Sequence, residues 1–209
     1  MNCEPGESYE RSASPNPVQQ VIELAETADL FHTPDRVAYA SIEVDGHIET
    51  HGIKSRTFKQ WLTRRFYEES GQPPRTQNLD DAIATLEAVA LFSGREEEVY
   101  LRVAQDSSAI YVDLGSRDWN AVRVTASGWN VIDNPPVKFR RTRSVGPLPE
   151  PVRGGSIDLL SEFVNLDDGQ DFKLVVSWLA ACFWSRGPYP VMVIQGEQGS
   201  CKSTMARVC

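Results

Sequence analysis

Residues 191–209 read VMVIQGEQGSCKSTMARVC, and this stretch decides how we interpret the rest of the chain. Four apolar residues, 191–194, lead directly into a loop that begins at Gly196, and a segment suited to a helix follows. Phosphate-binding P-loops have this order of strand, loop and helix, and their pattern is Gly, four residues, Gly, Lys and then Ser or Thr. Gly196 begins that pattern here, and Lys202 and Ser203 end it. The stretch therefore predicts a P-loop.

The residue types of this loop fit the chemistry of phosphate binding. Glycines such as Gly199 allow backbone N–H groups to point inward, and the following helix adds free amides and the positive end of its dipole. Lys202 would neutralise the β- and γ-phosphates, and the hydroxyl of Ser203 would ligate Mg²⁺. Cys201 departs from the pattern, because it stands where glycine is expected and its side chain could crowd the phosphate.

We therefore predict a site for ATP and Mg²⁺ that spans the loop and the start of the helix. It comprises Gly196, Glu197, Gln198, Gly199, Ser200, Cys201, Lys202, Ser203 and Thr204. The alternative is a chance Gly/Ser turn after a buried strand. The flanking strand and helix favour the phosphate interpretation, since the lysine alone would be much weaker evidence.

The composition is that of a globular chain whose charge is unevenly distributed. Hydrophobic residues make up 41% of the chain, and the net charge is −8. Residues 1–136 contain 12 Lys and Arg against 22 Asp and Glu, whereas residues 137–209 contain nine against seven. An acidic N-terminal part argues against a broad nucleic-acid surface there.

Membrane, secretion and metal signals are weak in this sequence. No run of about 18 apolar residues occurs, so we expect no membrane span. The polar, acidic N-terminus is unlike a signal peptide. The four cysteines form no CxxC and no Cys/His cluster, which disfavours a zinc site and a disulfide framework. A reducing cytoplasm fits this cysteine usage best.

The predicted fold class is an α+β N-terminal domain followed by the incomplete start of an α/β P-loop NTPase domain. Residues 1–17 are rich in Ser, Pro and Glu, which is typical of a disordered tail. Residues 18–136 form the α+β domain, and residues 137–155 form a basic linker rich in Pro and Gly. Residues 156–209 supply a helical segment and the first strand, P-loop and helix start of the NTPase domain.

The α+β domain begins with a helix and a hairpin. Apolar residues at helical spacing predict a short helix over about 18–30. Asp45-Gly46 lies between two alternating runs, 37–44 and 47–53, which is the strongest short-range signal for a hairpin.

Two longer helices should follow the hairpin. The basic run 55–70 has an apolar face, and its charges either contact phosphates or form a solvated face in which Glu68 and Glu69 supply local partners. Asn78 is the expected N-cap of the next helix, which Gly94 should end.

After these helices, the spacing of the apolar residues changes from the helical period to a period of two, which is typical of strands. Between Val99 and Ile132, four short apolar runs are separated by turn residues, which predicts an antiparallel meander. Trp119 and Trp129 lie in this region and are either ligand platforms or, more commonly, large residues that pack a small sheet.

The linker carries a basic cluster of Lys138, Arg140, Arg141 and Arg143. This cluster could contact a nucleic-acid backbone or could belong to a solvated linker, and four charges do not decide between the two. Ser156 should cap a short helix after the linker. The helix expected over 171–184 is so apolar that we predict it to be buried on most sides.

The chain stops seven residues after Lys202. A P-loop strand is central in a parallel sheet and needs neighbours, and catalysis needs an acidic residue that holds Mg²⁺ and a group that orients water. We therefore expect this chain to be the N-terminal piece of a longer protein or a truncated product. On its own it should not turn over ATP, and its nucleotide affinity should be poor.

The C-terminal part, from PLPEPVRGGSIDLLSEFVN at Pro147 through RGPYPVMVIQGEQGSCKST, resembles P-loop ATP-binding proteins of bacteria and their mobile elements. It is similar to the helicase half of phage-type primase–helicases, which are superfamily 3 or AAA+-like ATPases. The resemblance implies phosphate binding by Gly196, Gly199, Lys202, Ser203 and Thr204. It also implies a role in DNA replication, with DNA as a candidate partner and oligomers as an option for the complete protein.

Two functions remain for this sequence. The first is an ATP-dependent motor or switch ATPase that acts on DNA, present here as its N-terminal region. The second is a non-catalytic module whose α+β domain binds a protein or DNA and whose P-loop is degenerate. The acidic N-terminal part favours a protein partner for the second function.

Overall fold

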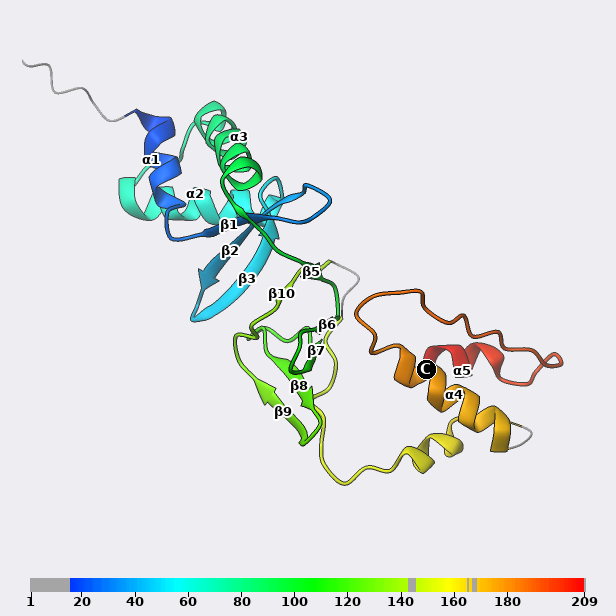
Figure 1. Cartoon of the computed structure of the whole chain (residues 1–209). Coiled ribbons are helices and arrows are strands. Elements are labelled where there is room, and N and C mark those ends of the chain that lie inside the picture. Colours follow the sequence, from blue (N-terminus) through cyan, green and yellow to red (C-terminus); the bar gives the residue numbers. More distant parts are fainter. Residues whose placement is uncertain (1–15, 143–145, 165, 167–168, 209) are drawn as a thin grey trace, which may run out of the picture. The chain divides into compact units, whose positions relative to one another are not determined.

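The computed structural model describes residues 16–142, 146–164, 166 and 169–208 and shows a mixed α+β chain (Figure 1). This confirms helices combined with small antiparallel sheets. Most of the predicted tail, 1–17, lies outside the described residues. The domain boundaries that we predicted stay a prediction.

The chain divides into two compact units. The first is built from residues up to 43 and from 50–97, and the second from 44–49 and from 98 onward. Each unit has its own buried side chains, and we describe each by itself.

The first unit contains three helices and most of a four-stranded sheet with the strand order β3-β2-β1-β4. The strands are β1 (Asp29–His32), β2 (Ala38–Val44), β3 (His47–Gly52) and β4 (Arg95–Glu96), and the helices are α1 (Pro17–Leu24), α2 (Arg56–Ser70) and α3 (Thr76–Phe92). The three helices contact one another, and α3 also contacts β1 (Figure 1). The largest residues of this unit that are at most 1% exposed form its interior: Val21, Phe31, Ile42, Ile53, Phe58 and Leu62.

The predicted hairpin is confirmed and has the backbone that its turn sequence requires. Asp45 and Gly46 have φ values of 49° and 86°. Positive φ at both central residues is the property of the turns that match the twist of paired strands. β2 and β3 are neighbours in the sheet, as the two alternating runs predicted.

The predicted helix over 55–70 is also confirmed. The hydroxyl of Ser55 accepts a hydrogen bond from the backbone N–H of Phe58 at 3.2 Å and caps the first turn. Gly71 ends the helix with a φ of 68°, the left-handed conformation that glycine adopts without strain.

Two of the four basic residues of α2 have acidic partners, and one of these partners is the predicted Glu68. Arg64 donates to Glu68 at 2.8 Å one turn further along the helix, and Lys59 pairs with Asp80 of α3. These charges are therefore partly neutralised within the first unit.

Two predictions in the first unit are wrong. The helix expected over 18–30 ends at Leu24, and Asp29–His32 forms β1 because β2 and β4 both offer backbone partners to it. Asn78 does not cap α3, which begins at Thr76 and places Asn78 inside its first turn.

The second unit contains the predicted antiparallel meander. Its strands pair in sequence order and are β6 (Val103–Gln105), β7 (Ile110–Asp113), β8 (Ala121–Thr125) and β9 (Gly128–Ile132). The alternating run that begins at Val99 is broken, because Val99–Tyr100 (β5) pairs in parallel with Lys138–Phe139 (β10). Ala104, Ala109, Tyr111, Ala121 and Phe139 form a buried cluster in this unit.

The helical segment of the second unit contains η1 (Ile157–Glu162), α4 (Gly169–Ala181) and α5 (Lys202–Val208). Ser156 caps η1 as predicted, since its side chain accepts from the N–H of Asp158 at 3.2 Å. A small buried cluster of Val164, Val175 and Met205 joins this segment, and Met192 and Ile194 pack against it.

Two expectations for this segment are wrong. The apolar helix α4 is not buried on most sides, because only Val175 and Ala181 of its described side chains are buried and Leu174 is 68% exposed. Residues 191–194 do not form a strand, since no described strand lies beside them to supply ladder hydrogen bonds. Their burial still alternates, with Met192 and Ile194 turned toward the cluster.

No helix among the described residues combines the length and the apolar character that a membrane crossing requires.

Candidate phosphate-binding loop

Residues 196–201 form a closed loop that returns on itself before α5 begins. The backbone N–H and the hydroxyl of Ser200 both donate to the carbonyl oxygen of Glu197, at 3.3 and 2.9 Å. Gly199 has a φ of 89°, which places it in the region that favours glycine. A β-carbon at Gly196 would lie 2.7 Å from the hydroxyl oxygen of Ser200, so the loop is tightly closed at its first residue.

Cys201 adopts a left-handed backbone conformation, with a φ of 59°. This conformation is costly for a residue with a β-carbon and is natural for glycine. Position 201 is also the position at which the P-loop pattern has its second glycine. The backbone at position 201 is therefore one that glycine adopts without strain, although the residue there is cysteine.

The ammonium of Lys202 lies inside the loop that precedes it. Its Nζ donates to the carbonyl oxygens of Gly196 at 2.9 Å and Glu197 at 2.6 Å, and to the hydroxyl oxygen of Ser200 at 3.2 Å. An ammonium has three donors and no acceptor, so these three oxygens satisfy it. The single positive charge of the loop is therefore held at its centre.

Helix α5 begins directly at this lysine. The N–H groups of Thr204 and Met205 both donate to the carbonyl oxygen of Cys201 at 3.0 Å. Met205 is 7% exposed and anchors the helix in the buried cluster with Val164 and Val175. Ser203 and Thr204, the next two residues of the helix, are exposed.

The other residues singled out from the sequence do not join this loop. Trp119 and Trp129 lie in the meander unit and each has an arginine over its ring: the Arg141 guanidinium carbon is 3.9 Å from the Trp119 ring centre, and that of Arg153 is 4.7 Å from the Trp129 ring centre. Arg141 also pairs with Asp113, so it is neither a solvated charge nor available to phosphates. Arg143 lies outside the described residues.

Sequence reasoning missed a second basic region of this unit. Arg123 and Arg153 line one pocket although they are 30 positions apart in the sequence. Neither stands in a cluster of basic residues, so no sequence pattern marked them. The register of the β8–β9 hairpin and the path of the chain after β10 bring this pocket together.

Comparison of the chain with protein-family models, with curated proteins and with solved structures found no match.

Proposed function

We propose that residues 196–204 bind the phosphates of ATP and that the chain is the ATP-binding part of a P-loop NTPase of the helicase-like, DNA-replication type. One observation carries this proposal. The backbone at Cys201 is left-handed at the position of the motif glycine, and the next residue, Lys202, holds its ammonium at the centre of the loop. A chance Gly/Ser turn would require neither feature.

Each residue type in the loop has a role in this proposal. Phosphate oxygens would replace the loop oxygens as acceptors for Lys202, because an ammonium bonds more strongly to charged acceptors than to neutral ones. The exposed hydroxyl of Ser203 fits as one oxygen ligand of Mg²⁺, which keeps several waters and phosphate oxygens in such sites. Mg²⁺, when bound, would neutralise phosphate charge.

The loop supports nucleotide binding rather than turnover. Hydrolysis needs an acidic residue that holds Mg²⁺ and a group that orients the attacking water. The described ranges contain no cluster of three or more His, Cys, Asp or Glu side chains arranged to hold a metal ion. We therefore propose that this loop holds ATP, and that turnover would need an acidic residue and a water-orienting group in addition.

Titration of a fluorescent ATP analogue into the full chain, with and without Mg²⁺, tests the proposal. Lys202→Ala should weaken binding by roughly 10- to 100-fold, because one charge-assisted contact is lost. Lys173→Ala is the matched control, since Lys173 is an exposed lysine of α4 outside the loop. Equal affinity of the wild type and Lys202→Ala would overturn the phosphate role.

A thiol-modification assay gives a second readout on the same loop. Cys182 and Cys201 are both exposed, so both should react with a small alkylating reagent. ATP should protect Cys201, which lies in the loop, and should leave the reaction of Cys182 unchanged. If ATP protects neither thiol, the loop is degenerate and the chain is better described as a non-catalytic binding module.

A further inference from the structure

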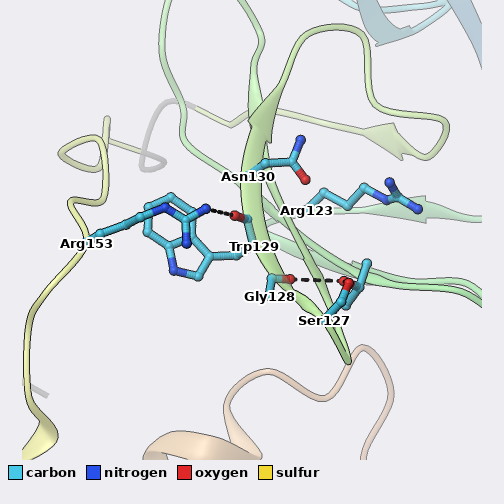
Figure 2. Close-up of a pocket in the computed structure, with 7 residues that line it drawn as sticks. Arg123, Ser127, Gly128, Trp129, Asn130 and Arg153 are labelled. Atoms are coloured by element: carbon cyan, nitrogen blue, oxygen red, sulfur yellow. Dashed lines mark hydrogen bonds between the residues drawn. The ribbon is translucent and has the colours of Figure 1, made fainter.

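A pocket of about 300 Å³ lies against the β8–β9 hairpin, far in sequence from the phosphate-binding loop. Two arginines, one tryptophan and four small or polar residues line it: Arg123, Thr125, Ser127, Gly128, Trp129, Asn130 and Arg153. None of these residues carries a carboxylate. The pocket therefore combines positive charge with hydrogen-bonding groups and one aromatic ring (Figure 2).

Arg153 is fixed in place against Trp129. Its guanidinium carbon lies 4.7 Å from the centre of the indole ring, and its Nη2 donates to the Trp129 carbonyl oxygen at 2.7 Å. Figure 2 shows the side chain of Arg153 lying over this ring. Arg153 is exposed, so it presents a flat cation with unused donors to solvent. Nucleic-acid bases stack on such guanidinium planes as they do on aromatic rings.

Arg123 supplies a second cation on the other side of the hairpin. Arg123 and Asn130 are opposite each other in the antiparallel register, so their side chains share one face of the sheet. Trp129 is the neighbour of Asn130 on the same strand and therefore points to the opposite face. No hydrogen bond or ion pair of the Arg123 guanidinium is found in the part of the chain that the structure describes.

The local charge favours an anionic ligand even though the whole chain is acidic. Residues 99–155 contain eight Lys and Arg against five Asp and Glu, whereas residues 1–98 contain nine against 18. Arg141 and Asp113 neutralise each other within the unit. The cations of the pocket have no such partner among its lining residues.

We propose that the β8–β9 hairpin binds single-stranded nucleic acid. A base stacks on Arg153, which Trp129 supports from below, and a neighbouring phosphate binds Arg123 with Asn130 and Ser127 beside it. Both cations line the same pocket, one over the Trp129 ring and the other beside Asn130, so one ligand can contact both. A single strand offers several flat bases in alternation with phosphates, whereas a free nucleotide offers only one base.

Fluorescence anisotropy on the full chain tests this site with a labelled oligothymidylate of roughly 20 nucleotides, longer than the ~4–16 nucleotides that small domains cover. Arg123→Gln and Arg153→Gln should each weaken binding about tenfold at moderate salt, because each removes one contact to the strand. Arg117→Gln is the matched control, since Arg117 is an exposed arginine of the same unit that does not line the pocket. It should change affinity less than about twofold.

A salt series and lysine variants separate the two roles. The slope of log K against log salt should fall by about 0.7 in Arg123→Gln, as expected for one lost phosphate contact to a single strand. Arg123→Lys should keep most of the affinity, whereas Arg153→Lys should lose it, because an ammonium offers no flat surface for a base. Circular dichroism spectra of all variants should match the wild type.

Three results would overturn the proposal. The first is the absence of wild-type binding, and the second is an equal loss in all three glutamine variants, which indicates unspecific charge attraction. The third is equal or tighter binding of the corresponding duplex or of free nucleotide. Lys202→Ala should bind the oligonucleotide like the wild type, so this test is independent of the proposed ATP site.

Discussion

Arg141 and Asp113 form a two-pronged ion pair between the end of β7 and the segment that follows β10. Nη2 of Arg141 lies 2.6 Å from Oδ1 of Asp113, and Nε lies 3.0 Å from Oδ2. The Asp113 side chain is 1% exposed and that of Arg141 is 14% exposed. Arg141 also lies over Trp119 and donates to the carbonyl oxygen of Ser116. The pair therefore fixes the segment after β10, which contains Arg141, to the meander.

Removing either partner of this pair should destabilise the second unit strongly. Arg141→Ala and Asp113→Ala should each cost about 3–5 kcal/mol, because a buried charge is left without its counter-ion. Urea denaturation followed by tryptophan fluorescence measures this loss. The double variant should lose less than the sum of the two single variants, and strictly additive losses would argue against the pairing.

Asp106 predicts a pH dependence at the β6–β7 turn. Its pKa is lowered from 3.8 to about 2, mainly by the backbone N–H of Ser108 and then by the Ser108 hydroxyl, with smaller contributions from Ala109 and Tyr111. Because the folded pKa lies below the unfolded one, the stabilisation is complete above about pH 4 and is lost as the pH falls toward 2.

Asp106→Asn is the variant that tests this dependence. At pH 7 its thermal midpoint should lie below that of the wild type, because the variant lacks the charged acceptor for Ser108 and Tyr111. The difference in thermal midpoint between the wild type and the variant should shrink as the pH falls from about 4 to 2. A gap that stays constant over this window would contradict the assigned cause.

Position 201 predicts an effect of backbone strain on nucleotide binding. Cys201→Gly should stabilise the loop by about 1 kcal/mol, since glycine adopts a φ of 59° without strain, and it should keep or improve ATP affinity. Cys201→Val should weaken both properties, because a β-branched residue is the least suited to this conformation. Isothermal calorimetry with ATP measures the affinities. Tighter binding by the valine variant would contradict the prediction.

The backbone around Gly94 in the first unit leaves no room for a β-carbon, so we expect that even alanine is not tolerated there. A β-carbon there would lie 2.4 Å from the carbonyl oxygen of Ala90 and 3.0 Å from that of Leu30, and both are backbone atoms. Gly94→Ala should therefore cost about 1–3 kcal/mol or more. Gly52→Ala is the control, because its β-carbon would meet only Tyr39 and Ala38 at ordinary distances. Comparable thermal midpoints for the two variants would refute the crowding at Gly94.

Local signals in the sequence predicted the local elements of this fold. Asp45-Gly46 specified the hairpin and Ser156 marked the start of η1, because turn and cap chemistry acts over a few residues. The meander strands were visible as short apolar runs separated by turn residues, and these runs pair in sequence order.

The sequence could not predict elements that depend on distant partners. β1 follows helical apolar spacing and becomes a strand only because β2 and β4 pair with it. The two-residue pairing of β5 with β10 joins segments that are 39 positions apart in register, from Val99 to Lys138, and is too short to leave a pattern. The apolar composition of α4 indicated burial, yet Leu174 is exposed. Composition alone does not show which other residues pack against a helix.

The two candidate sites also differ in how far the sequence could predict them. The P-loop pattern is contiguous, so all of its residues could be named before the structure was known. Arg123 and Arg153 share a pocket only through the hairpin register and the path of the chain after β10, and sequence spacing contains neither.

The left-handed backbone of Cys201 also has a consequence for saturation mutagenesis. In a library that samples all amino acids at this position, functional variants should rank by the steric demand of their β-carbon in this conformation and not by hydropathy or charge. Glycine should head the ranking, asparagine and aspartate should follow, and isoleucine, valine and threonine should be depleted together despite their different polarity.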